Sequence, residues 1–135
     1  MLEFPSTYKQ YEGRLITILV IDDEEPIREL VVNMLQGAGY NVLAASSGKA
    51  AIAISKDYIG SIRLLLTDVV LWRENCREIA RQISAARPTI KVLYMSGYVD
   101  YSIGSSSVLD STCEFIAKPF TSDQLLDKVR AVLEP

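Results

Sequence analysis

The sequence predicts an α/β fold in which helices cover both faces of a five-stranded parallel sheet. Two observations predict it: apolar runs alternate with amphipathic or capped segments, and several runs are almost continuously apolar, as in strands buried on both faces. The expected strands are 15–21, 40–45, 62–67, 90–95 and 113–117. Since crossovers between parallel strands are right-handed, the helices should form the outer layers of a three-layer sandwich.

The composition fits one ordinary globular domain. The chain has 135 residues, 49% of them hydrophobic and 23% charged, and should bury about two-thirds of its unfolded surface. Its net charge is -3 and it has no basic block, which argues against direct binding to nucleic acid. Residues 1–14 mix Pro5, Gly13 and polar residues without a period, so we interpret them as a leader or linker and 15–135 as the domain.

The location follows from what the sequence does not contain. No run is long enough to span a bilayer, and the start of the chain lacks the basic-then-apolar order of a signal peptide. We therefore expect a cytoplasmic domain without membrane contact. Because the chain ends just after the last predicted helix, we also expect it to signal by contact and not through an attached output domain.

The first and fifth predicted helices carry clear apolar stripes. The first has Pro26 in its first turn and ends at Gly37 and Gly39, and the fifth starts at Thr121 or Ser122. The residues expected to face inward are Ile27, Leu30, Val31, Met34 and Leu35 in the first helix and Leu125, Leu126, Val129, Val132 and Leu133 in the fifth.

The other helices are recognised by their starts. The second begins at Ser46 or Ser47, and the third has Asn75 and Glu78 at the spacing of a capping box. The fourth, over 99–109, contains a glycine and several serines, which cost roughly 0.5 to 1 kcal/mol each relative to alanine in a helix. We expect it to be the loosest helix.

Histidine and cysteine limit the possible chemistry. The chain has no histidine, which excludes Ser-His-Asp and Cys-His nucleophiles, most zinc sites and a phosphohistidine within the chain. Cys76 and Cys113 lie far apart without a CxxC spacing. They are expected to be ordinary thiols, buried or half-buried.

Three carboxylates follow the predicted strands at the edge where parallel strands end. Asp22 and Asp23 come after the first strand and Asp68 after the third, so the fold brings them together. Two carboxylates about 4 Å apart repel by roughly 4 kcal/mol at an effective dielectric constant near 20, so the cluster needs a cation. Oxygen ligands with room for water favour Mg²⁺. Taken alone, an Asp after a strand is as readily interpreted as a helix N-cap.

Lys118 adds a positive charge at the same edge, after the fifth predicted strand. A lone lysine at a strand end is usually just solvated. Here Pro119 follows, and the X-Pro bond can be cis, which would fix the direction of the preceding side chain.

Four motifs stand in order at the ends of the first, third, fourth and fifth predicted strands: VIDDEEPIREL, LLLTDVVL, VLYMSGY and FIAKPF. Together they resemble the response-regulator receiver domain, the CheY-like fold of two-component signalling, and are similar to receivers attached to hybrid sensor histidine kinases. The resemblance covers Ile16 to Leu133. It implies a doubly wound, flavodoxin-like sheet with strand order 2-1-3-4-5 and five helices.

The resemblance also implies a phosphoacceptor site. Asp68 would accept a phosphoryl group from a sensor histidine kinase or a histidine phosphotransfer protein. Mg²⁺ would be held by Asp22, Asp23, Asp68 and the backbone carbonyl of Val70, and Lys118 would offset the charge of the donor. The domain would catalyse its own phosphorylation and dephosphorylation as a signalling module and would not be an enzyme in the usual sense.

The implied switch involves Ser96 and Phe115. On phosphorylation the Ser96 hydroxyl would approach the phosphoryl oxygen and Phe115 would turn inward, changing the face made by the fourth helix, fifth strand and fifth helix. A downstream protein would bind this face, and a dimer could use it. Two simpler interpretations remain: Ser96 as a cap of the next helix and Phe115 as a core residue.

The loop after Asp68 departs from the family pattern. The usual Pro-Gly turn is replaced by the run from Trp72 to Cys76. Trp72 could pack on the third helix, cover the acceptor as a lid, or contact a partner. The departure also leaves open a receiver that takes no phosphate and serves only for docking. A flavodoxin-like flavin site and a dehalogenase-like phosphatase fit the motifs less well.

Overall fold

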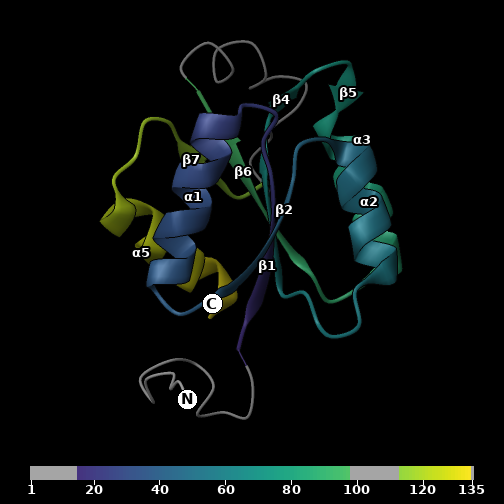
Figure 1. Cartoon of the computed structure of the whole chain (residues 1–135), viewed down its shortest axis with the longest axis horizontal. Coiled ribbons are helices and arrows are strands. Elements are labelled where there is room, and N and C mark those ends of the chain that lie inside the picture. Colours follow the sequence, from purple (N-terminus) through teal and green to yellow (C-terminus); the bar gives the residue numbers. More distant parts are fainter. Residues whose placement is uncertain (1–14, 98–112, 135) are drawn as a thin grey trace.

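The five predicted strands form one parallel sheet in the order β2-β1-β3-β6-β7, which is the predicted order 2-1-3-4-5 (Figure 1). The computed structural model describes residues 15–97 and 113–134. The strands of this sheet are β1 Thr17–Ile21, β2 Asn41–Ala45, β3 Leu64–Asp68, β6 Lys91–Ser96 and β7 Phe115–Ala117. Each begins and ends within two residues of its predicted bounds.

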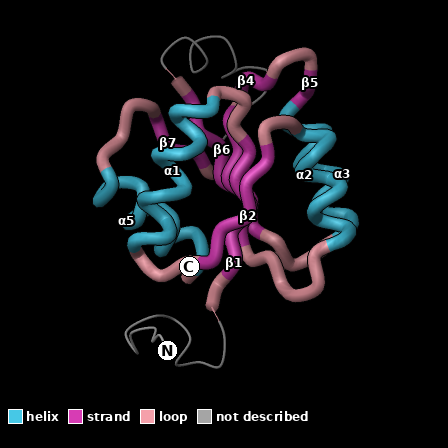
Figure 2. The backbone as a smooth tube through the Cα atoms, in the orientation of Figure 1, coloured by secondary structure: helices cyan, strands magenta, loops and turns pink. Residues whose placement is uncertain are grey.

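In the described residues, two helices cover each face of the sheet (Figure 2). They are α1 Glu25–Gly37 and α5 Ser122–Leu133 on one face, and α2 Gly48–Asp57 and α3 Cys76–Ala86 on the other. The three-layer sandwich is therefore confirmed. The predicted helix over 99–109 lies outside the described residues. In the described parts of the chain, no helix has the length and apolar character that crossing a bilayer requires.

The core has two halves because neighbouring residues of a strand point to opposite faces. In β1, Ile18 and Val20 pack on the α1 and α5 side, whereas Leu19 and Ile21 pack on the α2 and α3 side. All four side chains have no exposed surface. Burial on both faces explains why these strands are continuously apolar in the sequence.

Most predicted helix ends are found, with one correction. Ser47 and Asn75 are the N-caps of α2 and α3, as expected. Glu78, however, bonds to Arg81 and does not complete a capping box with Asn75.

Leu30, predicted to face inward, is 52% exposed. It lies one position, about 100° around the helix, from buried Val31, and so falls beyond the edge of the buried face.

The fifth helix begins with a complete capping box. Thr121 accepts a hydrogen bond from the Gln124 backbone N–H, and the Gln124 side chain accepts one from the Thr121 N–H. The predicted start at Thr121 or Ser122 is confirmed. Of the residues predicted to face inward, Leu126 is only partly buried, whereas Leu125 and Val129 are fully buried.

A short antiparallel hairpin between β3 and α3 is the main element that the sequence did not predict. It consists of β4 Val70–Leu71 and β5 Glu74–Asn75, joined by Trp72 and Arg73. Arg73 has a φ of 58°, a backbone conformation that residues other than glycine seldom adopt. The hairpin lies at the end of the sheet where α1 begins (Figure 1).

Helices α2 and α3 approach each other closely at Gly48. A Cβ atom built on Gly48 would lie 2.0 Å from Cδ1 of Ile79 and 2.6 Å from its Cγ1. The first residue of α2 therefore has to be small for the Ile79 side chain to occupy its position.

We expect Gly48→Ala to lower the free energy of unfolding by about 1–2 kcal/mol, because the added methyl group overpacks the contact with Ile79. Chemical unfolding followed by circular dichroism measures this. Gly37→Ala is the matched control, since nothing lies within 4 Å of its added Cβ, and it should be neutral or slightly stabilising. Truncating Ile79 to Ala in the Gly48→Ala chain should relieve part of the strain. If Gly48→Ala unfolds like the control, Ile79 moves aside at no cost.

Candidate functional site

The fold brings the three predicted carboxylates to one edge of the sheet. Asp22 follows the last residue of β1, Asp68 ends β3, and these two strands are hydrogen-bonded neighbours. One carboxylate oxygen from each of Asp22, Asp23 and Asp68 lies within 4.8 Å of the others. Asp22 and Asp68 are buried, and Asp23 is exposed. The predicted acidic cluster is therefore present.

Asp22 is fixed in place by its neighbours at the start of α1. Its Oδ1 accepts a hydrogen bond from the Glu24 N–H at 2.9 Å, and its backbone carbonyl accepts one from Arg28 at 2.8 Å. Burial raises the pKa of the Asp22 carboxyl; the Glu24 hydrogen bond and the Lys118 charge only partly oppose this. Its Oδ2 is buried and has no hydrogen-bond partner among the described residues.

Lys118 supplies the counter-charge that the sequence predicted. Its Nζ lies 3.2 Å from Asp68 Oδ1 and 3.7 Å from Asp22 Oδ2. Burial lowers the pKa of Lys118, but the charges of Asp68 and Asp22 outweigh burial, so the net direction is upward. Its backbone N–H donates to the Ser96 carbonyl at 2.8 Å, and the Lys118–Pro119 bond is cis.

The arrangement fits a small divalent cation. Three carboxylates converge on one volume, and Lys118 balances only one of their charges. The buried Oδ2 of Asp22 has Lys118 at 3.7 Å but no hydrogen-bond partner among the described residues, so it can still accept a ligand contact. Carboxylate oxygens with an open, partly exposed side suit Mg²⁺, which keeps several water ligands.

The other predicted site residues lie close by in the fold. Ser96 ends β6 and is fully buried, with its hydroxyl 3.4 Å from the Gly97 carbonyl. Phe115 begins β7, pairs in register with Tyr94 and packs on the α2 and α3 side of the core. Val70 lies in the hairpin and is 56% exposed. The roles of Ser96 and Phe115 and the Val70 carbonyl as a metal ligand stay predictions.

The structure decides one alternative for Trp72. Its side chain is 73% exposed, so it does not pack on α3. The guanidinium carbon of Arg73 lies 5.3 Å from its ring centroid. The Trp72 backbone N–H donates to Asp23 Oδ2 at 3.0 Å. This contact could not be predicted from local sequence patterns, because it joins residues 49 positions apart.

The two cysteines are ordinary thiols, as predicted. Both are free; Cys76 is buried and Cys113 is partly buried. Burial raises the pKa of Cys76 to about 11, so its thiol stays protonated at neutral pH. A thiolate nucleophile next to the acidic cluster is therefore excluded for Cys76.

Comparison with known proteins identifies the family. The model of the response regulator receiver domain matches residues 18–130, which contain the acidic cluster and Lys118. This chain is a member of that family. Receiver domains of two-component systems are signalling domains, and they bind Mg²⁺ at an acidic cluster of this kind.

The similar proteins include both long and short chains. The sensor kinase CckA of Brucella abortus is 31% identical over 118 residues, which are 87% of this chain and 12% of that protein. The response regulator receiver protein CpdR of Brucella abortus is 27% identical over 116 residues, which are 86% of this chain and 95% of CpdR. The chain thus corresponds to one part of the longer relatives and to nearly all of CpdR.

Solved structures agree with the family. The receiver domain of the hybrid histidine kinase CckA superposes with a TM-score of 0.73 at 26% identity, covering 87% of this chain and 99% of that one. A response regulator receiver protein from Sinorhizobium medicae WSM419 gives a TM-score of 0.75 at 29% identity, covering 90% and 96%. Both structures support the fold assignment.

Without divalent cations, Asp22→Asn should raise the free energy of unfolding at pH 7 by an amount on the order of 1 kcal/mol. The amide removes the buried charge and still accepts the Glu24 hydrogen bond. Because the folded-state pKa of Asp22 is raised, this carboxyl favours folding only when protonated, and its contribution is lost as pH rises through that pKa. The gain from Asp22→Asn should therefore shrink as the pH falls and the wild-type carboxyl protonates.

Unfolding at several pH values, followed by circular dichroism, measures this difference. Glu29→Gln removes one negative charge from the exposed side of α1 and is the matched control. An equal gain in both variants would contradict the explanation, because it would trace the effect to net charge and not to the buried carboxyl.

Proposed function

We propose that this chain is a phosphoacceptor receiver domain in which Asp68 takes a phosphoryl group from the histidine of a partner kinase or phosphotransfer protein. The observation that carries the proposal is the buried Asp68 carboxylate, which lies in a cluster with Asp22 and Asp23 and 3.2 Å from Lys118. We place this function in the cytoplasm.

The reaction is a displacement at phosphorus. A carboxylate oxygen of Asp68 forms a bond to phosphorus while the bond between phosphorus and the donor nitrogen breaks, and the released imidazole takes up a proton. Lys118 faces the negative charge of the phosphoryl oxygens. Mg²⁺, held by Asp22, Asp23 and Asp68, would supply the remaining positive charge. The Val70 carbonyl completes the proposed ligand set.

The site must also exclude competing nucleophiles. Asp22 is fully buried and its Oδ1 is held by the Glu24 N–H, so its carboxylate cannot swing out to attack the donor. Asp68 is 5% exposed and lies at the end of its strand. Its position, and not its intrinsic reactivity, makes it the proposed nucleophile.

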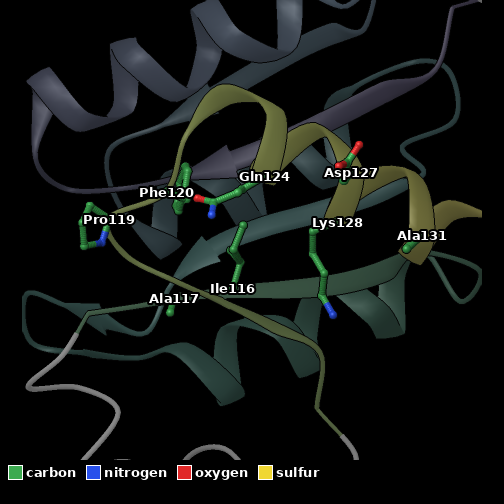
Figure 3. Close-up of a pocket in the computed structure, with 8 residues that line it drawn as sticks. All are labelled: Ile116, Ala117, Pro119, Phe120, Gln124, Asp127, Lys128 and Ala131. Atoms are coloured by element: carbon green, nitrogen blue, oxygen red, sulfur yellow. The ribbon is translucent and has the colours of Figure 1, made fainter.

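The proposed output runs from Ser96 and Phe115 to the face of β7 and α5. The Lys118 N–H bonds to the Ser96 carbonyl, so a shift of Ser96 is passed on to the end of β7. Next to β7 and α5 lies a hollow of about 580 Å³ lined in part by Ile116 and Phe120 (Figure 3). We propose that a downstream protein, or a second copy of the chain, binds over this face.

Phosphorylation of Asp68 is tested by incubating the chain with Mg²⁺ and a small phosphodonor such as acetyl phosphate and measuring the intact mass. The wild-type chain should gain one phosphoryl group, and Asp68→Asn should gain none because the amide is not a nucleophile. Removal of Mg²⁺ by a chelator should slow the labelling by at least about 100-fold.

The matched control is Asp57→Asn, at the exposed C-terminal end of α2, which should be labelled like the wild type. A folded wild-type chain that takes no phosphoryl group from the small donor or from a histidine kinase would contradict the proposal. That result would instead favour a docking module that acts without phosphorylation, which the altered loop after Asp68 makes the second candidate.

A further inference from the structure

The β4–β5 hairpin is anchored to both neighbouring helices by side chains of β5. The Glu74 carboxylate accepts hydrogen bonds from the backbone N–H groups of Gly48 and Lys49 at 2.8 and 3.1 Å, at the start of α2. Asn75 accepts from two N–H groups in the first turn of α3. On the other strand, Leu71 is only 4% exposed. The hairpin is therefore held firmly although it is short.

The tip of this anchored hairpin reaches the acidic cluster through its backbone. The Trp72 N–H donates to Asp23 Oδ2 at 3.0 Å, while the Trp72 side chain is 73% exposed. Trp72 is the first of the two residues that join β4 and β5, so its N–H is not used in the pairing of Leu71 with Glu74. The contact to Asp23 thus depends on the main chain of Trp72 and not on its ring.

Asp23 is the carboxylate of the cluster that gains most from such a contact. Asp22 is fully buried and bonded to the Glu24 N–H, and Asp68 is buried beside Lys118. Asp23 is exposed, and the Trp72 N–H is its only hydrogen-bond partner among the described residues. An exposed carboxylate changes rotamer freely unless a fixed donor holds it, and the N–H dipole also offsets part of the repulsion from its neighbours.

We propose that the Trp72 backbone N–H is a positioning group for the divalent-cation site, holding Asp23 Oδ2 so that the Asp23 carboxylate is oriented before the ion binds. The inference rests on the proposed function, because it concerns how the same site acquires its ion. Outer hydrogen-bond donors of this kind typically change metal affinity by about 10- to 100-fold. The hairpin, which replaces a Pro-Gly turn, would thus take over the task of arranging the ligands.

Substitution by proline separates the two parts of Trp72. Trp72→Pro removes the N–H, and proline suits the first position of a two-residue turn. Trp72→Ala removes the ring and keeps the N–H. Isothermal titration with MgCl₂ should give wild-type affinity for Trp72→Ala and about 10-fold weaker binding for Trp72→Pro. Circular dichroism and unfolding curves establish that both variants are folded.

Hydrogen exchange on the wild-type chain provides a second measurement that needs neither metal nor the proline variant. The Trp72 amide should exchange at least about 10-fold more slowly than the same amide in Asp23→Ala, because its acceptor is then missing. Trp72→Ala should keep the slow exchange.

The outcomes distinguish this inference from the proposed function. If the wild type binds Mg²⁺ and is phosphorylated while Trp72→Pro binds as tightly as Trp72→Ala, the inference is wrong and the function stands. An exchange rate unaffected by Asp23→Ala overturns it as well. If the wild-type chain takes up no Mg²⁺, the proposed function and this inference both fail.

Discussion

The crowding of three carboxylates at one edge of the sheet is the constraint on which the site depends. Their oxygens lie within 4.8 Å of one another, and two of the three residues are buried. At such distances each pair repels by several kcal/mol at an effective dielectric constant near 20, and Lys118 compensates for only part of this. The fold tolerates the strain because hydrogen bonds and β-sheet pairing hold Asp22 and Asp68 rigidly. The repulsion that Lys118 does not compensate favours the binding of a cation.

The sheet and the acidic cluster could be predicted because both follow from local sequence patterns. Strands buried on both faces have to be apolar throughout, and the ends of parallel strands meet at one edge, so Asp22, Asp68 and Lys118 were expected together. The capping box of α5 was missed in part, since Thr121 was recognised as a start but Gln124 was not seen as its partner. Glu78 has the spacing from Asn75 that a capping box requires, but its carboxylate instead accepts a hydrogen bond from Arg81, one turn along the same helix.

The hairpin could not be predicted because its stability comes from contacts distant in sequence. The run from Val70 to Asn75 has no glycine or proline, and Arg73 adopts a φ of 58° that its side chain alone would disfavour. Two hydrogen bonds offset the cost of this backbone conformation: the Glu74 carboxylate accepts one from the start of α2, and the Trp72 N–H donates one to Asp23. Leu30 was misjudged for a related reason: a stripe shows which side of a helix faces inward, but the neighbouring elements decide how wide the buried face is.

The exposed position of Trp72 also determines what optical spectroscopy of this protein reports. It is the only tryptophan of the chain, whereas the seven tyrosines include Tyr94 in the core. An indole ring that is 73% exposed should already show, in the native state, the red-shifted ultraviolet emission typical of solvated tryptophan. Loss of the core would therefore change tryptophan emission little, while an event at the acidic edge would reach the indole through the Trp72 main chain, whose N–H contacts Asp23. In this molecule the indole is a reporter of the hairpin tip beside the site, and Tyr40 and Tyr94 are reporters of the core.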